Sequence, residues 1–149
     1  PDRRAIHIGE CVKMILENIK DNYQHECANI SFGIDIPSHI APDPDVVVSC
    51  CMIISEAVIN SVTHAFAGNM NGEIYIMMRE NRPGDFILHI SDNGKGIFTA
   101  KRSIGSGMAI IEELVRGLNG TVNIASDKGT SYIIDFRKDG KSRSKDIKQ

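Results

Sequence analysis

The chain has 149 residues, of which 42% are hydrophobic and 24% are charged, and its formal net charge is -2. This length and composition fit one globular domain with a sizeable core, and the near-balanced charge gives no general attraction to nucleic acid or to an anionic membrane. The cysteines, Cys11, Cys27, Cys50 and Cys51, contain no Cys-x-x-Cys pair. This favours reduced thiols in the cytoplasm over disulfides or a structural zinc site.

The start of the chain and its apolar runs set two further expectations. The sequence shows no apolar signal segment at its start. It begins with Pro1 rather than methionine, so we expect a fragment of a longer protein. The longest apolar run, residues 46–54, is short for a bilayer span and is interrupted by Ser49. We therefore expect no membrane contact by this domain.

The first predicted elements are a helix over residues 5–22 and a strand over residues 29–37. Apolar residues recur at steps of three and four in the helix, whereas the strand alternates apolar and polar residues up to Pro37. Residues 41–45 are a proline-rich helix start, and the helix that follows runs to Phe66. Its predicted core positions, again at steps of three and four, are Val47, Cys51, Ile54, Val58, Val62 and Ala65.

The second half of the chain is predicted to be rich in paired strands. Strands at 73–80 and 85–91 are followed by a glycine-punctuated stretch, a helix at 108–118 and strands at 121–126 and 130–136. Adjacent strand pairs exclude a regular alternation of strands and helices. We expect an α+β fold, a two-layer sandwich whose mixed, mostly antiparallel sheet carries helices on one face. The domain is expected to span residues 1–137, with a disordered polar tail at 138–149.

The helix at 46–66 carries a polar stripe. Glu56, Asn60 and His64 follow one another at steps of four, so an acid, an amide and an imidazole share one face. Taken alone, the stripe also fits a solvated surface. It indicates a metal site only weakly, because no other acid or histidine completes a ligand set.

Glycine-rich segments follow this helix. "DNGKGI" at 92–97 does not match G-x-G-x-x-G, and G-x-x-x-x-G-K-[ST] is absent, so both common phosphate-loop patterns fail. "GSGM" at 105–108 precedes a helix, whose N-terminal N–H groups favour an anion, although these glycines could merely end a loop. Gly129 and Thr130 open the last strand.

In this order, E-x-x-x-N-x-x-x-H, D-x-G-x-G, G-x-G and G-T resemble the ATP-binding catalytic domain of sensor histidine kinases. That domain belongs to the Bergerat-fold (GHKL) class, which includes gyrase, Hsp90 and MutL. The resemblance covers residues 5–136. "SEAVINSVTHAF" resembles the N box, with His64 where many members carry lysine, and its His-Ala-Phe end is similar to one kinase subgroup. "SDNGKGI" resembles the G1 box, and "GSGM" resembles the G2 box.

The resemblance implies a role for each matched residue around the base. Asp92 would accept a hydrogen bond from the adenine amino group, which suits an ionised carboxylate because it is an acceptor only. Gly94 and Gly96 would give the base access to the backbone, and Thr130 would support the base directly or through water. Ile97 would also belong to the nucleotide site.

The remaining matched residues would serve the phosphates. Asn60 would bind Mg²⁺ through its oxygen, Glu56 would act as general base or orient the attacking group, and His64 would lie near the phosphates. Lys101 or Arg102, in the short segment 99–104, could also reach them. The G2-box residues of the site would be Gly105, Ser106, Gly107 and Met108.

The implied activity is ATP-dependent phosphorylation of a histidine in two-component signalling. The acceptor would lie on dimerisation helices upstream in a longer protein, and a response regulator would act downstream. The domain would be cytoplasmic, alone or as the cytosolic part of a membrane-bound sensor. "HECAN" at 25–29 is not expected to be the acceptor, because it is predicted to begin a strand and lacks a helical hairpin.

Two alternatives stay open. An anti-sigma-factor serine kinase shares these boxes, but the link "VRGLNGT" at 115–121 looks more like the histidine kinases. A degenerate binding module without ATP is the other alternative, and the intact motif residues argue against it.

Overall fold

The computed structural model describes residues 7–66, 71–96 and 107–142. Its helices are α1 (Ile8–Asn22), α2 (Gln24–Cys27), α3 (Pro44–Asn60), the π-helix η1 (Ser61–Ala65) and α4 (Gly107–Gly117). Its strands are β1 (Ile30–Asp35), β2 (Gly72–Arg82), β3 (Asp85–Asp92), β4 (Thr121–Ala125) and β5 (Ser131–Arg137).

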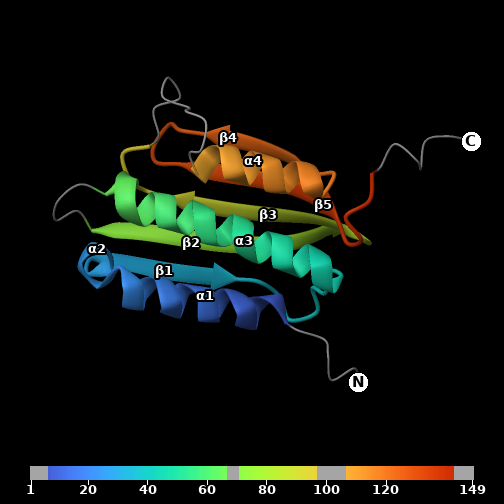
Figure 1. Ribbon diagram of the computed structural model, residues 1–149, viewed down its shortest axis with the longest axis horizontal. Helices are drawn as coiled ribbons and strands as arrows, with labels where there is room; N and C mark the ends of the chain where they lie inside the picture. Colours follow the sequence, from blue (N-terminus) through green and yellow to red (C-terminus); the bar gives the residue numbers. More distant parts are fainter. Residues whose placement is uncertain (1–6, 67–70, 97–106, 143–149) are drawn as a thin grey trace, which may run out of the picture.

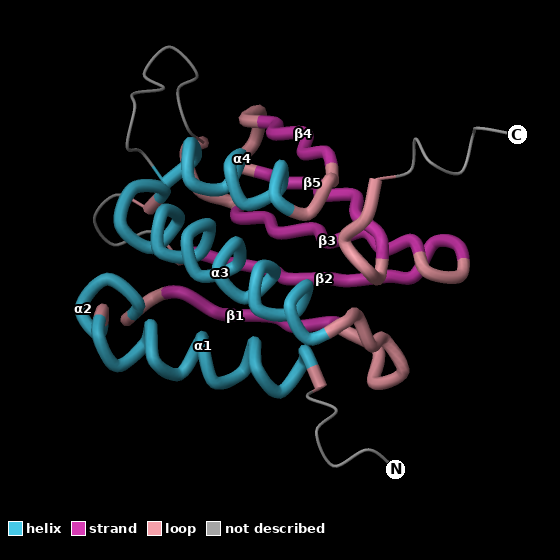
Figure 2. Tube along the Cα trace, turned by 45° about the vertical axis from the view of Figure 1, so that its right-hand side comes forward, coloured by secondary structure: helices cyan, strands magenta, loops and turns pink. Residues whose placement is uncertain are grey.

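The strands form one five-stranded sheet in the order β1-β2-β3-β5-β4. Only the β1–β2 pairing is parallel, and the other three pairings are antiparallel. Helices α1, α3 and α4 cover one face of this sheet, with α3 between the other two (Figure 1). Figure 2 shows the same two layers from another side. The predicted α+β sandwich is therefore confirmed.

The alternation of side chains along the strands decides what faces the helices. In β3, Phe86, Leu88 and Ile90 are buried under the helical layer, and Asp92 continues the same alternation. In β5, Tyr132 is buried in the same way, and Thr130 lies two residues before it. The acid and the hydroxyl singled out in the sequence therefore lie on the helix-covered face, at neighbouring strand ends.

The buried face of α3 differs from the predicted one at a cysteine. Cys51 is only half-buried and packs at the edge of the core, whereas Cys50, which the spacing does not predict, is fully buried. Because α3 lies on the sheet between α1 and α4, its buried face is broader than a single stripe. The buried residues of α3 are Val46, Val47, Cys50, Ile53, Ile54, Ala57 and Val58.

Helices α3 and η1 together also pass a length and composition test for a membrane span. Their 22 residues, Pro44–Ala65, are longer than the apolar run 46–54 considered in the sequence. Half of the most apolar window is buried inside the protein, as in the core helix of a globular domain. The burial follows from the position of α3 at the centre of the helical layer (Figure 2).

Two local predictions need correction. Residues 24–27 form the short helix α2, and β1 begins only at Ile30, so "HECAN" does not begin a strand. The helix predicted to run regularly to Phe66 changes to π-helical hydrogen bonding at Ser61.

The chain beyond β5 keeps contact with the domain over its first residues. The carbonyl of Lys138 accepts a hydrogen bond from Asp43 N at 3.0 Å, and Asn119 Nδ2 donates to Gly140 O at 2.8 Å. Residues 143–149 of the expected tail lie outside the described residues. The division of the chain at residue 137 stays a prediction.

Candidate functional site

The carboxylate of Asp92 lies at the end of β3 and is 8% exposed. Its Oδ1 accepts hydrogen bonds from Gly94 N at 2.9 Å and from Thr130 N at 3.1 Å. Its Oδ2 accepts a hydrogen bond from Ser61 Oγ at 2.5 Å. A carboxylate offers about four lone-pair positions, so these three donors leave one acceptor position on Oδ2. The geometry suits a ligand that presents a single N–H donor.

The serine reaches Asp92 from the π-helix. Ser61 is the first residue of η1 and is 4% exposed. A π-helix places one additional residue in each hydrogen-bonded turn, and such segments are frequent at functional sites. Ala65 ends this segment, and its carbonyl accepts a hydrogen bond from Lys95 N at 2.9 Å. The π-helix therefore contacts the end of β3 and the segment after it through both of its own ends.

Two glycines allow the backbone segments around Asp92 to approach one another. A Cβ on Gly94 would lie 2.4 Å from Ala65 O, and one on Gly129 would lie 2.0 Å from Asp92 O. Gly129 also has φ +103°, in the region that disfavours other residues. The structure thus gives Gly94 a packing role, and its expected role in base access stays a prediction.

Gly96 shows the same requirement with a different neighbour. It has φ +84°, and a Cβ there would lie 2.7 Å from Ser126 Oγ. The expected access of the base to Gly96 likewise stays a prediction. Ile97, the next residue, lies outside the described residues.

Two buried hydroxyl groups lie beside Asp92. Thr130 and Tyr132 are each 1% exposed, and within the described residues neither Thr130 Oγ1 nor Tyr132 Oη has a hydrogen-bond partner. Burial raises the pKa of Tyr132, the nearby Asn60 side chain opposes this rise, and the charge of Asp92 adds to it. Buried polar groups are normally paired, so both hydroxyls mark places where water or a ligand can bind.

The structure brings only part of the predicted polar stripe, Glu56, Asn60 and His64, close to Asp92. Asn60 lies near Tyr132 and thus near Asp92, whereas Glu56 is half-buried one turn earlier and His64 is exposed. Within the described residues, no hydrogen bond or ion pair joins the side chains of these three residues. The regular spacing by four ends at η1, so His64 does not simply continue the face of Glu56 and Asn60.

The predicted phosphate loop is mostly outside the described residues, and this applies to Lys101, Arg102, Gly105 and Ser106. Gly107 begins α4, and the side chain of Met108 is buried. The loop is thus followed by an 11-residue helix, as expected.

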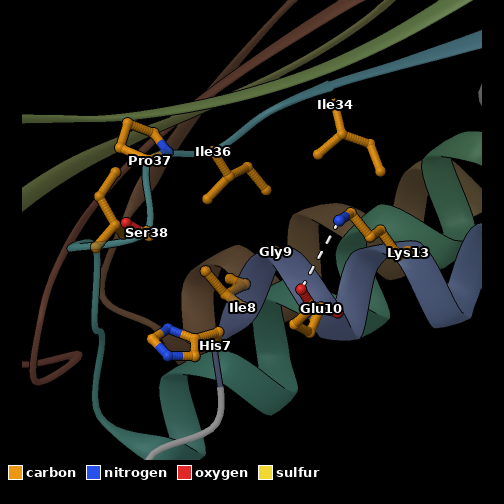
Figure 3. Close-up of a pocket in the computed structure, with 10 residues that line it drawn as sticks. His7, Ile8, Gly9, Glu10, Lys13, Ile34, Ile36, Pro37 and Ser38 are labelled. Atoms are coloured by element: carbon orange, nitrogen blue, oxygen red, sulfur yellow. Dashed lines mark ion pairs between the residues drawn. The ribbon is translucent and has the colours of Figure 1, made fainter.

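The cavity in Figure 3 lies elsewhere. It measures about 340 Å³ and is lined at its polar rim by His7, Glu10, Lys13 and Ser38. It adjoins the end of β1, whereas Asp92 pairs with Ile74 near the start of β2. Because β1 and β2 are parallel, the cavity and Asp92 are at opposite ends of the sheet.

Sequence reasoning missed Ser61 and Tyr132, and it gave Gly129, part of the G-T motif, no role in the site. The sequence shows Gly129 at the start of a strand, but it gives no sign of the contact with Asp92. Ser61 and Tyr132 occupy positions predicted from periodicity alone, where a hydroxyl has no distinguishing pattern. Only the fold brings them to Asp92.

Known proteins resemble this chain in sequence and in fold. The family described as "Histidine kinase-, DNA gyrase B-, and HSP90-like ATPase" matches residues 45–140. The sensor histidine kinase YdfH of Bacillus subtilis is 31% identical over 78% of this chain and 29% of its own length. The nitrate/nitrite sensor protein NarQ of Escherichia coli is 32% identical over 82% of this chain and 21% of its own length. The chain therefore spans less than a third of either sensor protein.

A shorter relative is covered almost completely. An anti-sigma F factor of Clostridium botulinum is 28% identical over 79% of this chain and 89% of its own length. Among solved structures, the histidine kinase domain of the blue-light activated kinase EL346 from Erythrobacter litoralis superposes with a TM-score of 0.75. The match has 20% identity and covers 89% of this chain and 61% of that one, so it concerns the fold.

Proposed function

Because the chain belongs to the family of histidine kinase-, DNA gyrase B- and HSP90-like ATPases, we propose that it is the ATP-binding catalytic domain of a sensor histidine kinase. The observation that carries this proposal is the buried Asp92 carboxylate, held by three donors with one acceptor position left on Oδ2. An adenine amino group is a donor of the required kind, whereas guanine presents an oxygen acceptor at the same ring position. Thr130 Oγ1 supports the base directly or through one water.

The phosphates extend from this base site toward the end of α3. Asn60 offers a side-chain oxygen to a Mg²⁺ ion that arrives with the nucleotide, Glu56 orients or deprotonates the attacking group, and His64 contacts the phosphates. Within the described residues, no group of three or more His, Cys, Asp or Glu side chains could hold a metal alone. Mg²⁺ in such sites needs only one or two protein oxygens, because phosphates and water complete its shell. When bound, Mg²⁺ neutralises charge that develops on the transferred phosphoryl group.

The predicted G2 box would complete the phosphate site. Backbone N–H groups at Gly105, Ser106 and Gly107 bind phosphate at the start of α4, where the helix N-terminus favours negative charge. Lys101 or Arg102 adds a positive charge. Met108 contributes packing at the same helix end, because its side chain is buried.

The phosphoryl acceptor belongs to another part of a longer protein. We propose that a histidine on upstream dimerisation helices receives the γ-phosphate and that a response regulator then takes it. This fits the sensor kinases, of which the chain spans less than a third. The domain acts in the cytoplasm, alone or below a membrane-bound sensor.

A second candidate is an anti-sigma-factor serine kinase. The specific observation in its favour is the coverage of the anti-sigma F factor, 89% of which matches this chain. The two candidates differ in the phosphorylated group. Incubation with labelled ATP and each purified acceptor separates them, because phosphohistidine is lost in acid and phosphoserine is retained.

The nucleotide site is tested by calorimetric titration of ADP and Mg²⁺ into the wild-type chain and Asp92→Asn. The asparagine oxygen can still accept from Gly94 N and Thr130 N, and its amide can donate to Ser61 Oγ, so the fold should persist. The side-chain NH2 group of the asparagine then faces the adenine amino group, and two donors cannot form a hydrogen bond with each other. A hydrogen bond to a charged group contributes about 1.5–3 kcal/mol, so affinity should fall about 10- to 100-fold.

The exposed acid of α1 provides the matched control. Asp21→Asn removes the same charge from the exposed surface of α1, at a residue that makes none of the hydrogen bonds described around Asp92, and should leave ADP affinity unchanged. Normal ADP binding by Asp92→Asn would exclude Asp92 as the base-recognition residue. Absence of binding by the wild-type chain at millimolar ADP would exclude the proposed function.

A further inference from the structure

We infer that Ser61 is a positioning residue that makes Asp92 selective for a 6-amino over a 6-oxo purine. The inference rests on the proposed function, because it concerns the same base site. It goes further in assigning the selectivity to Ser61, a residue of η1 for which the resemblance implies no role.

The hydrogen bond between Ser61 and Asp92 is short and buried. Ser61 Oγ lies 2.5 Å from Asp92 Oδ2, and the two residues are 4% and 8% exposed. A distance of about 2.5–2.7 Å is typical of a hydroxyl that donates to an ionised oxygen. An ionised carboxylate has no proton to give, so the serine is the donor. The bond also joins η1 to the end of β3, and the two bonded residues are 31 positions apart in the chain.

The division of donors between the two carboxylate oxygens gives the selectivity. The backbone N–H groups of Gly94 and Thr130 both bind Oδ1, so Oδ2 is the oxygen that keeps an acceptor position for the ligand. Ser61 occupies one acceptor position of Oδ2 and leaves the other. A 6-amino group can donate to that position, whereas a 6-oxo group brings a second acceptor and no proton. A site built around such a donor strongly rejects an analogue that lacks it.

Removal of the serine hydroxyl should relax this rejection. In Ser61→Ala, Oδ2 loses its donor from the protein, and a water molecule can take the place of the hydroxyl. Water both donates and accepts, so it can turn to donate to a 6-oxo group. The fixed hydroxyl of Ser61 cannot do this while its only proton is bound to Asp92.

The π-helix supplies a matched control. Thr63 lies two residues after Ser61 in η1, but its hydroxyl is exposed and donates to Ile59 O at 2.7 Å, one turn earlier in the helix. Thr63→Ala therefore removes a hydroxyl from the same short element without touching Asp92. Any general effect of disturbing η1 should appear in both alanine variants.

The experiment measures ADP and inosine diphosphate affinities by competition with a fluorescent nucleotide, using the full 149-residue chain. Wild type and Thr63→Ala should strongly prefer ADP. Ser61→Ala should bind ADP about tenfold more weakly, as expected for a lost hydrogen bond to a charged group. Its affinity for inosine diphosphate should stay equal or rise, so the selectivity ratio falls at least as much. Ser61→Cys, with a thiol of similar size but weaker donor strength, should show a reduced ratio if the alanine variant unfolds.

The outcomes separate the inference from the proposed function. Equal weakening of both nucleotides in Ser61→Ala would show a merely structural role and overturn the inference. An unchanged selectivity ratio in both Ser61 variants would also overturn it, although wild-type ADP binding would leave the proposed function standing. If wild type binds neither nucleotide, the proposed function fails and the inference fails with it.

Discussion

Substitution of Gly129 by alanine should be the most damaging single-methyl change at the site. Gly129 has φ +103°, and a Cβ there would lie 2.0 Å from Asp92 O and 3.0 Å from Asn93 Cα. Both neighbours are backbone atoms, which cannot move aside as the end of a flexible side chain can. The methyl group therefore has to displace the residue whose side chain carries the site.

The magnitude follows from two separable costs. A positive φ disfavours alanine by about 1–2 kcal/mol, and insertion of a methyl group into a packed region costs about 1–3 kcal/mol. Gly129→Ala incurs both, so the free energy of unfolding should fall by about 2–5 kcal/mol. Gly84 separates the two costs, because it has φ +81° but no heavy atom within 4 Å of the position that a Cβ would occupy. Gly84→Ala should incur only the first cost.

Urea denaturation of the wild-type chain, Gly129→Ala and Gly84→Ala measures these differences in the free energy of unfolding. The comparison requires that the three proteins have equal m-values. Titration with ADP gives the functional consequence. Relief of the contact displaces the backbone of Asp92, so Gly129→Ala should bind ADP more weakly than the wild-type chain does. Gly84 is remote from the site, so Gly84→Ala should bind ADP normally. If Gly129→Ala were no less stable than Gly84→Ala and bound ADP equally well, the close approach to Asp92 would be refuted.

Two further predictions concern buried polar groups. Burial raises the pKa of Cys50, and burial together with Cys11 raises the pKa of Cys51 to about 11, so few thiolates exist at a pH of about 8. Iodoacetamide should leave Cys50 unmodified in the native chain and label Cys51 more slowly than in urea, as mapped by mass spectrometry; equal rates would contradict this. If no water binds the Tyr132 hydroxyl in the free chain, Tyr132→Phe should raise the free energy of unfolding by about 1 kcal/mol, because it removes a buried hydroxyl without a partner among the described residues. Urea denaturation tests this, and a loss of stability would show that the hydroxyl is hydrogen-bonded.

Periodicity is sufficient to predict most of the architecture. The strand predicted at 85–91 is β3, Asp85–Asp92, and the helix predicted at 108–118 is α4, Gly107–Gly117. These elements are long enough for an alternation or a helical repeat to be recognised. Helix α2 has four residues, too few for any repeat to show, and the sequence therefore predicts the beginning of a strand there.

The details of the site cannot be predicted in the same way. The change to π-helical bonding at Ser61 has no sequence pattern, because Ser61, Val62 and Ala65 would be equally acceptable in an α-helix. The burial of Cys50, with Cys51 only half-buried, means that at this turn of the helix the buried face of α3 is turned by one residue from the predicted face. It depends on how α3 packs between its neighbours, which the spacing of apolar residues alone does not determine.

The packing around Asp92 also explains why motifs so far apart in the chain form one site. Gly94 allows contact with Ala65 of the π-helix, and Gly129 allows contact with the backbone of Asp92. These contacts bring Ser61 Oγ and Thr130 N within hydrogen-bonding distance of the carboxylate. The donors that fix Asp92 are therefore supplied by the folded chain itself. A ligand that donates to Oδ2 would meet an oriented acceptor and would not incur the cost of ordering it, which is the condition under which a single hydrogen bond contributes most to affinity.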